Sequence, residues 1–201
     1  MESIVLASKS IDRQKILHNA RIPIEVLATD VDEEKYKEKF SDAIMLAKEL
    51  AKAKALYAKN LLIKSDRDVF IIAADTLVEL KGEIIGKAKT EQNAFNILKK
   101  LTGNIHSLIT GIAITKTYTP KLISDYESTD VKFVKLTDNE IDNYLKSNEW
   151  QGRAGAYAIT ERASLFIEYI RGSFSNVIGL PLHKIFLIFK EHFKLNLLKY
   201  F

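Results

Sequence analysis

Residues 71–87 read IIAADTLVELKGEIIGK, and they decide the fold class. The run at 69–74 is apolar, rich in β-branched and small side chains, and too short for a helix. Such a run is typical of a strand buried on both faces, as in the parallel sheets of α/β proteins. We therefore predict an α/β sheet with flanking helices, in which Asp75 follows directly after the end of this strand and Lys87 lies on the next segment.

The other segments alternate between strand-like and helix-like patterns. Strands are predicted at residues 4–8, 24–28, 107–117, 127–136, 154–160 and 165–170. Helices are predicted from about residue 10, from residue 41, at 90–101, at 137–144, and around residues 185–193. Thr90 is the expected cap of one helix, and Thr137 with Glu140 forms the expected capping box of another. In the helix from residue 41 the predicted apolar stripe is Leu46, Leu50, Ala53, Leu56 and Tyr57.

The composition is that of an ordinary globular domain. The chain has 201 residues, of which 47% are hydrophobic, and we predict a single domain over residues 1–201. Cysteine is absent, which excludes disulfides, thiol nucleophiles and cysteine-bound zinc. The formal charge is +4, but both signs are mixed along the chain, as at residues 32–39. The N-terminus resembles neither a signal peptide nor a membrane span, so we expect a cytoplasmic protein without membrane partners.

The first candidate binding position is LASKSIDRQ at residues 6–14. Ser8 and Ser10 leave a predicted strand, and the helix that begins near Ser10 directs its free N–H groups and positive dipole end outward. Arg13, in the first turns, can clamp phosphate oxygens. The alternative is an ordinary serine cap followed by a surface arginine.

The second candidate position surrounds Asp75. A carboxylate next to an apolar strand requires a cation or a metal ion to remain ionised. Glu33 leaves the second predicted strand in a similar way, and Lys54 and Lys87 are available as countercharges. Magnesium typically takes one or two carboxylates plus substrate phosphates, so these residues suit that ion. The alternative is that Asp75 and Thr76 only tie a loop together through backbone N–H groups.

Several other chemistries are excluded by spacing. The GEIIGKA stretch at 82–88 has one residue too few between its glycines for a phosphate loop and no hydroxyl residue after the lysine. The four histidines have no metal-ligand spacing, and no serine-hydrolase elbow is present. Aromatic residues are not interleaved with a basic patch, so nucleic acid is not an expected partner.

Taken in order, the motifs resemble the Maf family of nucleotide pyrophosphatases. The matching stretches are LASKS (6–10), VDE (31–33), LAKAKA (50–55), AADTLV (73–78), GEIIGK (82–87), LTGNIHSLITGIAI (101–114), AGAY (154–157) and FSNVIGLPL (174–182). Each motif alone is weak, but the ordered set is specific and spans residues 4–184, nearly the whole chain.

This resemblance implies a fold like that of inosine triphosphate pyrophosphatase, with a mixed twisted sheet and two lobes around a central cleft. It implies hydrolysis of a nucleoside triphosphate to the monophosphate and pyrophosphate with Mg²⁺ or Mn²⁺, and a homodimer. Carried over position by position, it implies a catalytic base at Asp75, metal binding by Glu33 and Asp75, phosphate binding by Ser8, Arg13, Lys54 and Lys87, and base selection by Asp12, Thr76 and Thr160.

The sequence departs from the family pattern at three places. Ile11 and Asp12 stand where the pyrimidine-selective branch has proline and arginine, and Thr160 stands where that branch has glutamine. Ala88 replaces a common proline. The carboxylate of Asp12 can accept from an imino or exocyclic N–H of a base. A preference for modified or pyrimidine nucleotides is therefore open at this level.

One alternative function is a catalytically weak regulator of cell division that senses nucleotides or binds nucleic acid. The complete polar set argues against it, because a pure binding module has no need of Asp75 beside carboxylates and lysines. The apolar C-terminal helix predicts core or dimer packing, with a partner helix or a membrane surface as the alternative.

Overall fold

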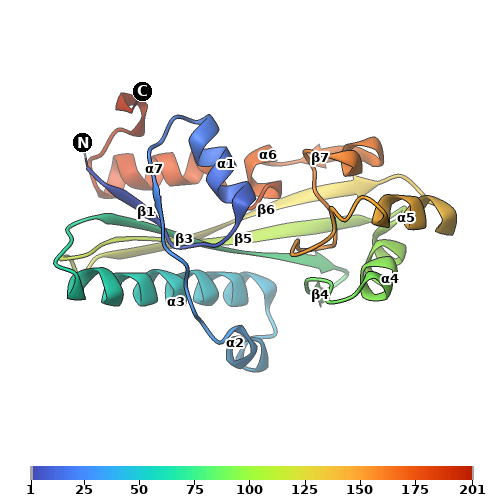
Figure 1. Ribbon diagram of the computed structural model, residues 1–201, viewed down its shortest axis with the longest axis horizontal. Coiled ribbons are helices and arrows are strands. Elements are labelled where there is room, and N and C mark those ends of the chain that lie inside the picture. The colour runs from blue at the N-terminus through green and yellow to red at the C-terminus, as the bar shows by residue number, and fades with distance from the viewer. Residues whose placement is uncertain (1, 201) are drawn as a thin grey trace. The chain divides into compact units, whose positions relative to one another are not determined.

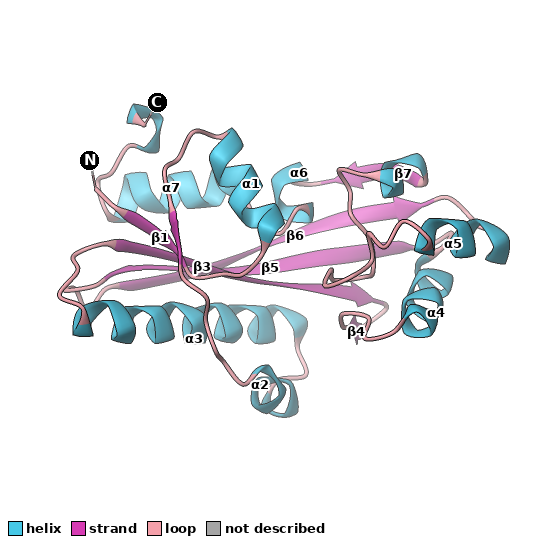
Figure 2. Ribbon diagram, viewed as in Figure 1, coloured by secondary structure: helices cyan, strands magenta, loops and turns pink. Residues whose placement is uncertain are grey.

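The computed structural model describes residues 2–200 as an α/β fold (Figures 1 and 2). The strands in sheet order are β2 (Glu25–Val26), β1 (Ile4–Leu6), β3 (Phe70–Leu80), β5 (Ile105–Lys116), β6 (Leu122–Phe133) and β7 (Ile167–Arg171), with β4 (Glu83–Ile85) paired to β3. β1 is parallel to β2 and β3, whereas β4 and β7 are antiparallel to their neighbours. The sheet is therefore mixed, which confirms the predicted fold class.

The chain forms two compact units. Unit 1 contains the residues up to Asp75, Thr110–Glu127 and the residues from Gly179 onward, and unit 2 contains Thr76–Ile109 and Ser128–Ile178. Strands β3, β5 and β6 contribute residues to both units. Each unit has a hydrophobic core made of its own residues.

Unit 1 has helices on both faces of its strands (Figure 1). Its helices are α1 (Ile11–Asn19), α2 (Glu33–Lys39), α3 (Ala43–Lys64), α7 (Leu182–His192) and the short 3-10 helix η2 (Leu197–Lys199). Ile4, Leu6, Phe70 and Ile72 pack with α1 and α7, whereas the alternate positions, Val5, Ala7, Ile71 and Ala73, pack with α3. Both faces are therefore buried, which explains the uninterrupted apolar runs in β1 and β3.

Helix α3 begins where the sequence predicts, but its buried face differs from the predicted stripe. Asp42 is the N-cap and accepts from the N–H of Met45. Leu56, expected inside, is 46% exposed, and the buried face is rich in alanine: Ala43, Leu46, Ala47, Leu50, Ala51, Lys54, Ala55, Ala58 and Leu62. Small side chains allow the helix backbone to approach the sheet closely. At Gly111 of β5 an added Cβ would lie 2.2 Å from the carbonyl oxygen of Ala47.

Strand β3 is longer than predicted. The prediction that Asp75 follows the end of a strand is wrong, because β3 continues without interruption from Phe70 to Leu80. A carboxylate in a strand interior is unfavourable unless a partner compensates it, and no local pattern reveals such a partner. The prediction that Glu33 leaves a strand also fails, since Glu33 is the first residue of the unpredicted helix α2.

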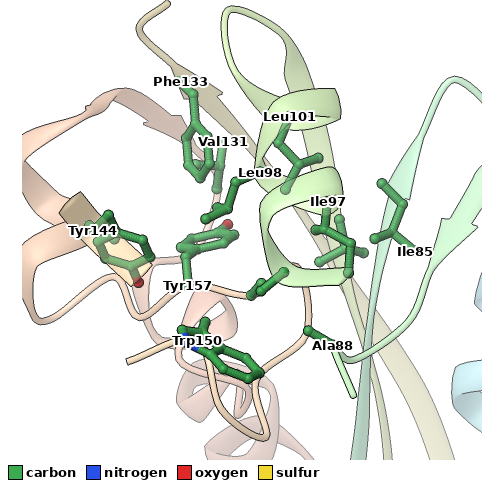
Figure 3. Packing of buried hydrophobic residues seen from close by; sticks show 14 of the residues in the cluster. Ile85, Ala88, Ile97, Leu98, Leu101, Val131, Phe133, Tyr144, Trp150 and Tyr157 are labelled. Atoms are coloured by element: carbon green, nitrogen blue, oxygen red, sulfur yellow. The ribbon is translucent and has the colours of Figure 1, made fainter. Parts of the chain in front are cut away.

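Unit 2 is built around one hydrophobic cluster, part of which Figure 3 shows. Its helices are α4 (Glu91–Leu101), α5 (Asp138–Leu145), the 3-10 helix η1 (Arg162–Leu165) and α6 (Phe174–Val177). The side chain of Leu98 from α4 points toward Val131 of β6 and the ring of Tyr157 (Figure 3), and Leu101 and Phe133 belong to the same cluster. The predicted capping residues are confirmed: Thr90 caps α4, and Thr137 with Glu140 forms a capping box on α5.

Two features of unit 2 differ from the predictions. Strand β4 was not predicted; it joins β3 through a two-residue turn at Lys81 and Gly82, whose φ values are +53° and +82°, as hairpin turns require. The strand predicted at 154–160 is wrong, because only Ala154 forms a bridge there and Gly155 and Ala156 have φ of +71° and +60°. An extended strand is incompatible with these two backbone angles.

The contact between Gly111 and α3 can be tested by mutation. We expect Gly111→Ala to lower the free energy of unfolding by about 3 kcal/mol, because a rigid helix backbone must move to admit the methyl group. Urea denaturation measures the change. The matched control is Gly86→Ala, where nothing lies within 4 Å of the added Cβ; its effect should stay below about 0.5 kcal/mol. Equal effects of the two substitutions would contradict the close approach.

Candidate active site

The central group of unit 1 is the Asp75 carboxylate. Side chains alternate along β3, so Asp75 lies on the same face as Ile71 and Ala73, which is the face covered by α3. Lys54 reaches it from the buried face of α3, and its Nζ donates to Asp75 Oδ1 at 2.5 Å. Both side chains are about nine-tenths buried, at 9% and 11% exposure. The ion pair is the compensation that a carboxylate in this position requires.

Glu33 joins the same ion pair. Lys54 Nζ also donates to Glu33 Oε1 at 2.7 Å, so one ammonium group bridges two carboxylates from β3 and α2. Glu33 is more accessible, with 38% of its side chain exposed. The structure therefore brings together three of the predicted site residues, two of which were assigned to metal binding. We call Glu33, Lys54 and Asp75 the carboxylate cluster.

Arg13 and Ser8 form a second group of contacts in unit 1. Ser10 is the N-cap of α1 and accepts from the N–H of Arg13, and Ser8 Oγ accepts from the N–H of Ser10 at 3.2 Å. Arg13 donates from Nη1 to Ser8 Oγ at 3.1 Å and from Nε to the Gly179 carbonyl at 2.7 Å. The alternative of a surface arginine is therefore wrong, because Arg13 is 9% exposed and tethers α1 to the segment before α7.

The electrostatics link Arg13 to the carboxylate cluster. Burial lowers the pKa of the Arg13 guanidinium, while the negative charges of Asp75, Glu33 and Asp12 act in the opposite direction. The guanidinium therefore stays charged within the field of the carboxylates. Arg13 and Lys54 together balance Asp75 and Glu33, so these four side chains have no net charge. They supply no surplus positive charge for an anionic substrate.

The donor set of the carboxylate cluster fits a divalent cation that is shared with a substrate. Within residues 2–200 no group of three or more His, Asp or Glu side chains is placed to hold a metal ion. Two carboxylates within reach of one ammonium group match the usual magnesium arrangement of one or two protein carboxylates plus phosphate oxygens. Metal binding by Glu33 and Asp75 stays a prediction.

The remaining predicted site residues lie at different places. Asp12 is half-buried on the first turn of α1, where the helix dipole stabilises a negative charge. In unit 2, Thr76 lies on β3, and the backbone of Lys87 forms an antiparallel bridge with Ala154. Thr160 is exposed, just after the buried segment that ends at Ile159. Their roles in base selection and phosphate binding stay predictions.

Sequence reasoning missed two backbone anchors of the site. The Gly179 carbonyl holds Arg13 at a separation of 166 residues, and Ala154 pairs with Lys87. Both lie in motifs quoted above, FSNVIGLPL and AGAY, so the family pattern marks them although their residue chemistry does not. Carbonyl and amide groups have no signal of their own in a sequence.

Comparison with known proteins places this arrangement in a family. A family model described as Maf-like protein matches residues 3–192. The chain belongs to this Maf-like family. The matched range contains all the residues of unit 1 and unit 2 named above as site candidates, so the carboxylate cluster is part of the family domain.

Relatives of this Maf-like chain carry the name dTTP/UTP pyrophosphatase. The protein of Alkaliphilus oremlandii is 42% identical over 198 residues, which cover 98% of this chain and 100% of the relative. That of Alkaliphilus metalliredigens is 39% identical over 198 residues, with coverages of 98% and 100%. That of Caldanaerobacter subterraneus is 40% identical over 190 residues, with coverages of 94% and 89%.

In residues 2–200 no helix combines the length and apolar content that crossing a membrane requires.

The bridging role of Lys54 is testable through stability. We expect Lys54→Met to lower the free energy of unfolding at pH 7 by about 3 kcal/mol, since it leaves the buried Asp75 carboxylate without its countercharge. The control is Lys52→Met on the same helix, which breaks the more exposed Lys52–Glu49 pair and should cost less than about 1 kcal/mol. Denaturant titration measures the stability of both variants. Equal losses in the two would contradict the role of Lys54 as the bridge between Asp75 and Glu33.

Proposed function

We propose that this chain hydrolyses a nucleoside triphosphate to the monophosphate and pyrophosphate, with dTTP and UTP as its substrates. The observation that carries the proposal is the carboxylate cluster, in which a buried Asp75 is held by Lys54 beside Glu33. The names of the relatives, dTTP/UTP pyrophosphatase, support the same reaction and the same bases. Cleavage between the α and β phosphates requires a water in line with the α phosphorus and stabilisation of the departing charge.

Asp75 is the group that we assign to the attacking water. Lys54 holds Oδ1 of this carboxylate, which orients the other oxygen, Oδ2, as the acceptor for a water proton. The ion pair with Lys54 also compensates for the burial of the Asp75 carboxylate. Because β3 and α3 fix both partners, the base is positioned before a substrate arrives, as efficient proton transfer requires.

Glu33 and Asp75 are the residues that would hold Mg²⁺ or Mn²⁺. The ion would supply the electrostatic stabilisation of the phosphate oxygens that Arg13 and Lys54, balanced by the two carboxylates, do not provide in surplus. Glu33 is suited to this contact because it is the more exposed carboxylate and lies at the start of α2. Asp75 is suited because only one of its oxygens is held by Lys54.

Phosphate binding is assigned to Ser8, Arg13, Lys54 and Lys87. Arg13 is tethered through Nε and Nη1, so its contribution is a fixed positive charge and not a mobile clamp. Ser8 and Ser10 lie at the N-terminus of α1, where the helix dipole favours an anion. Lys87 carries an ammonium group on a flexible stem, which suits a point contact to phosphate oxygens.

Base selection is assigned to Asp12, Thr76 and Thr160. Uracil and thymine present an imino N–H between two carbonyl groups, and a carboxylate such as Asp12 can accept from that N–H. Thr76 and Thr160 have hydroxyl groups, which can donate to a base carbonyl. The homodimer implied by the family and the cytoplasmic location expected from the N-terminal sequence stay predictions.

A substrate panel tests the proposed reaction. We expect pyrophosphate release from dTTP and UTP, with matching monophosphate, and loss of the signal in EDTA followed by recovery with Mg²⁺ or Mn²⁺. Release of orthophosphate instead would contradict the proposal and indicate phosphatase activity. If folded protein were silent on every triphosphate while short DNA or RNA raised its Tm, the regulatory alternative would be favoured.

The role of Asp75 predicts a specific kinetic defect. Asp75→Asn should lower kcat by about 100-fold or more while the fold is retained, as expected for loss of a positioned base. The matched control is Asp125→Asn, which removes another lysine-paired carboxylate of unit 1, bonded to Lys184 at 2.9 Å. The control should keep kcat within about twofold. Unchanged turnover in Asp75→Asn would remove Asp75 from the mechanism.

A further inference from the structure

The segment 150–159 of unit 2 connects two of the proposed substrate-binding residues. Ala154 pairs with the backbone of Lys87, and Thr160 follows the segment directly. Between them the chain turns through Gly155 and Ala156, both with positive φ. A non-glycine residue adopts such a φ only where the surroundings hold it, so the geometry of this segment depends on its anchors. We call residues 150–159 the anchor loop.

The anchor loop lies close to β3. A Cβ on Gly155 would meet Val78 Cγ2 at 3.0 Å and the Tyr157 ring at 3.0 Å, so glycine is required for both space and φ. Thr76 lies two positions before Val78 on the same strand. The loop is thus adjacent to all three proposed substrate contacts of unit 2. Thr76 lies on β3, Lys87 pairs with the loop, and Thr160 follows it.

Tyr157 is a buried anchor of the loop. Its ring is buried in the cluster of unit 2, where it lies among Phe133, Tyr144 and Leu98 (Figure 3). It contacts the Phe133 ring edge-on, with 4.8 Å between the centroids. Its hydroxyl forms a hydrogen bond of 3.0 Å with Nε2 of His106, which is also buried. A buried tyrosine hydroxyl needs such a partner, and this one is 51 residues away in the sequence.

His106 has few alternatives to this bond. Burial lowers its pKa to about 4, with Asp130 acting in the opposite direction, so the imidazole is neutral at physiological pH. Its other nitrogen, Nδ1, has no hydrogen-bond partner among residues 2–200. Edge-on contact with Phe133 at 4.7 Å fixes the ring itself. Tyr157 is therefore the polar contact through which this histidine acts on the loop.

We propose that Tyr157 and His106 are positioning residues. They hold Lys87 and Thr160 in the positions from which both can contact the same substrate molecule. The inference rests on the proposed function, in which Lys87 meets the phosphates and Thr160 meets the base. The hydrogen bond fixes the anchor loop between these residues, three positions after Ala154 and three before Thr160. Neither Tyr157 nor His106 needs to touch the substrate for this role.

The test is Tyr157→Phe, which removes only the hydroxyl group. We expect KM for dTTP and UTP to rise about fivefold, the size of one lost hydrogen bond, with kcat within about twofold because Asp75 and Lys54 are untouched. The preference for UTP over CTP, measured as the ratio of kcat/KM values, should fall as well, because Thr160 is released. Lys87→Ala provides the comparison, because it should lower kcat/KM by a similar factor for triphosphates of every base.

The matched control is Tyr200→Phe in unit 1. Tyr200 is also buried, and its hydroxyl donates to the Glu2 carbonyl at 2.9 Å, so the substitution loses a comparable bond away from the anchor loop. Its KM and base preference should match the wild type. A second pair of variants repeats the test: His106→Leu should raise KM as Tyr157→Phe does, and His106→Gln, which keeps a polar partner for Tyr157, should restore most of the loss.

The outcomes separate the two proposals. If the wild type releases pyrophosphate and neither Tyr157→Phe nor His106→Leu changes KM or base preference, the positioning inference is overturned and the proposed function stands. If both variants lower Tm but leave KM and base preference unchanged, the pair has only a structural role and the inference is also overturned. If the folded wild type releases no pyrophosphate from any triphosphate, the proposed function fails and the inference fails with it.

Discussion

The ammonium group of Lys54 between Asp75 and Glu33 is the interaction on which the rest of unit 1 depends. It allows a carboxylate to occupy the interior of β3, where an isolated charge would be prohibitively unfavourable. Removing one partner of such a pair is far more destabilising than never having formed it. The strand can therefore be long and buried and still carry a carboxylate in its interior.

The alanine-rich face of α3 makes this ion pair possible. Small side chains bring the helix backbone against β5 at Gly111, so Lys54 reaches the sheet within the length of its own side chain. A helix faced with leucines would stand further away. The same arrangement leaves Arg13 and Lys54 balanced against two carboxylates, which explains why a triphosphate would need a divalent cation in addition to the protein.

The sequence predicts the features that arise from local patterns. The caps at Thr90 and Thr137 depend on residues three positions apart, and both are confirmed. The end assigned to β3 was wrong because the partner of Asp75 comes from another element, 21 residues away. AGAYAI has a strand-like pattern, but tertiary contacts with Lys87 and His106 impose a loop with left-handed residues. Residue chemistry at the predicted strand ends named most of the site residues, and the resemblance to the family assigned their roles, but no local pattern specifies their mutual contacts.

The origin of the oxygen that enters the product tests the account most directly. Hydrolysis of dTTP or UTP in ¹⁸O-labelled water, followed by mass spectrometry of both products, shows which phosphorus the water attacks. If Asp75 directs water to the α phosphorus, the label appears in the nucleoside monophosphate and not in pyrophosphate. Label in pyrophosphate would mean attack at the β phosphorus, and label in orthophosphate would mean a different reaction. Either result would contradict the assignment of Asp75 and its cluster.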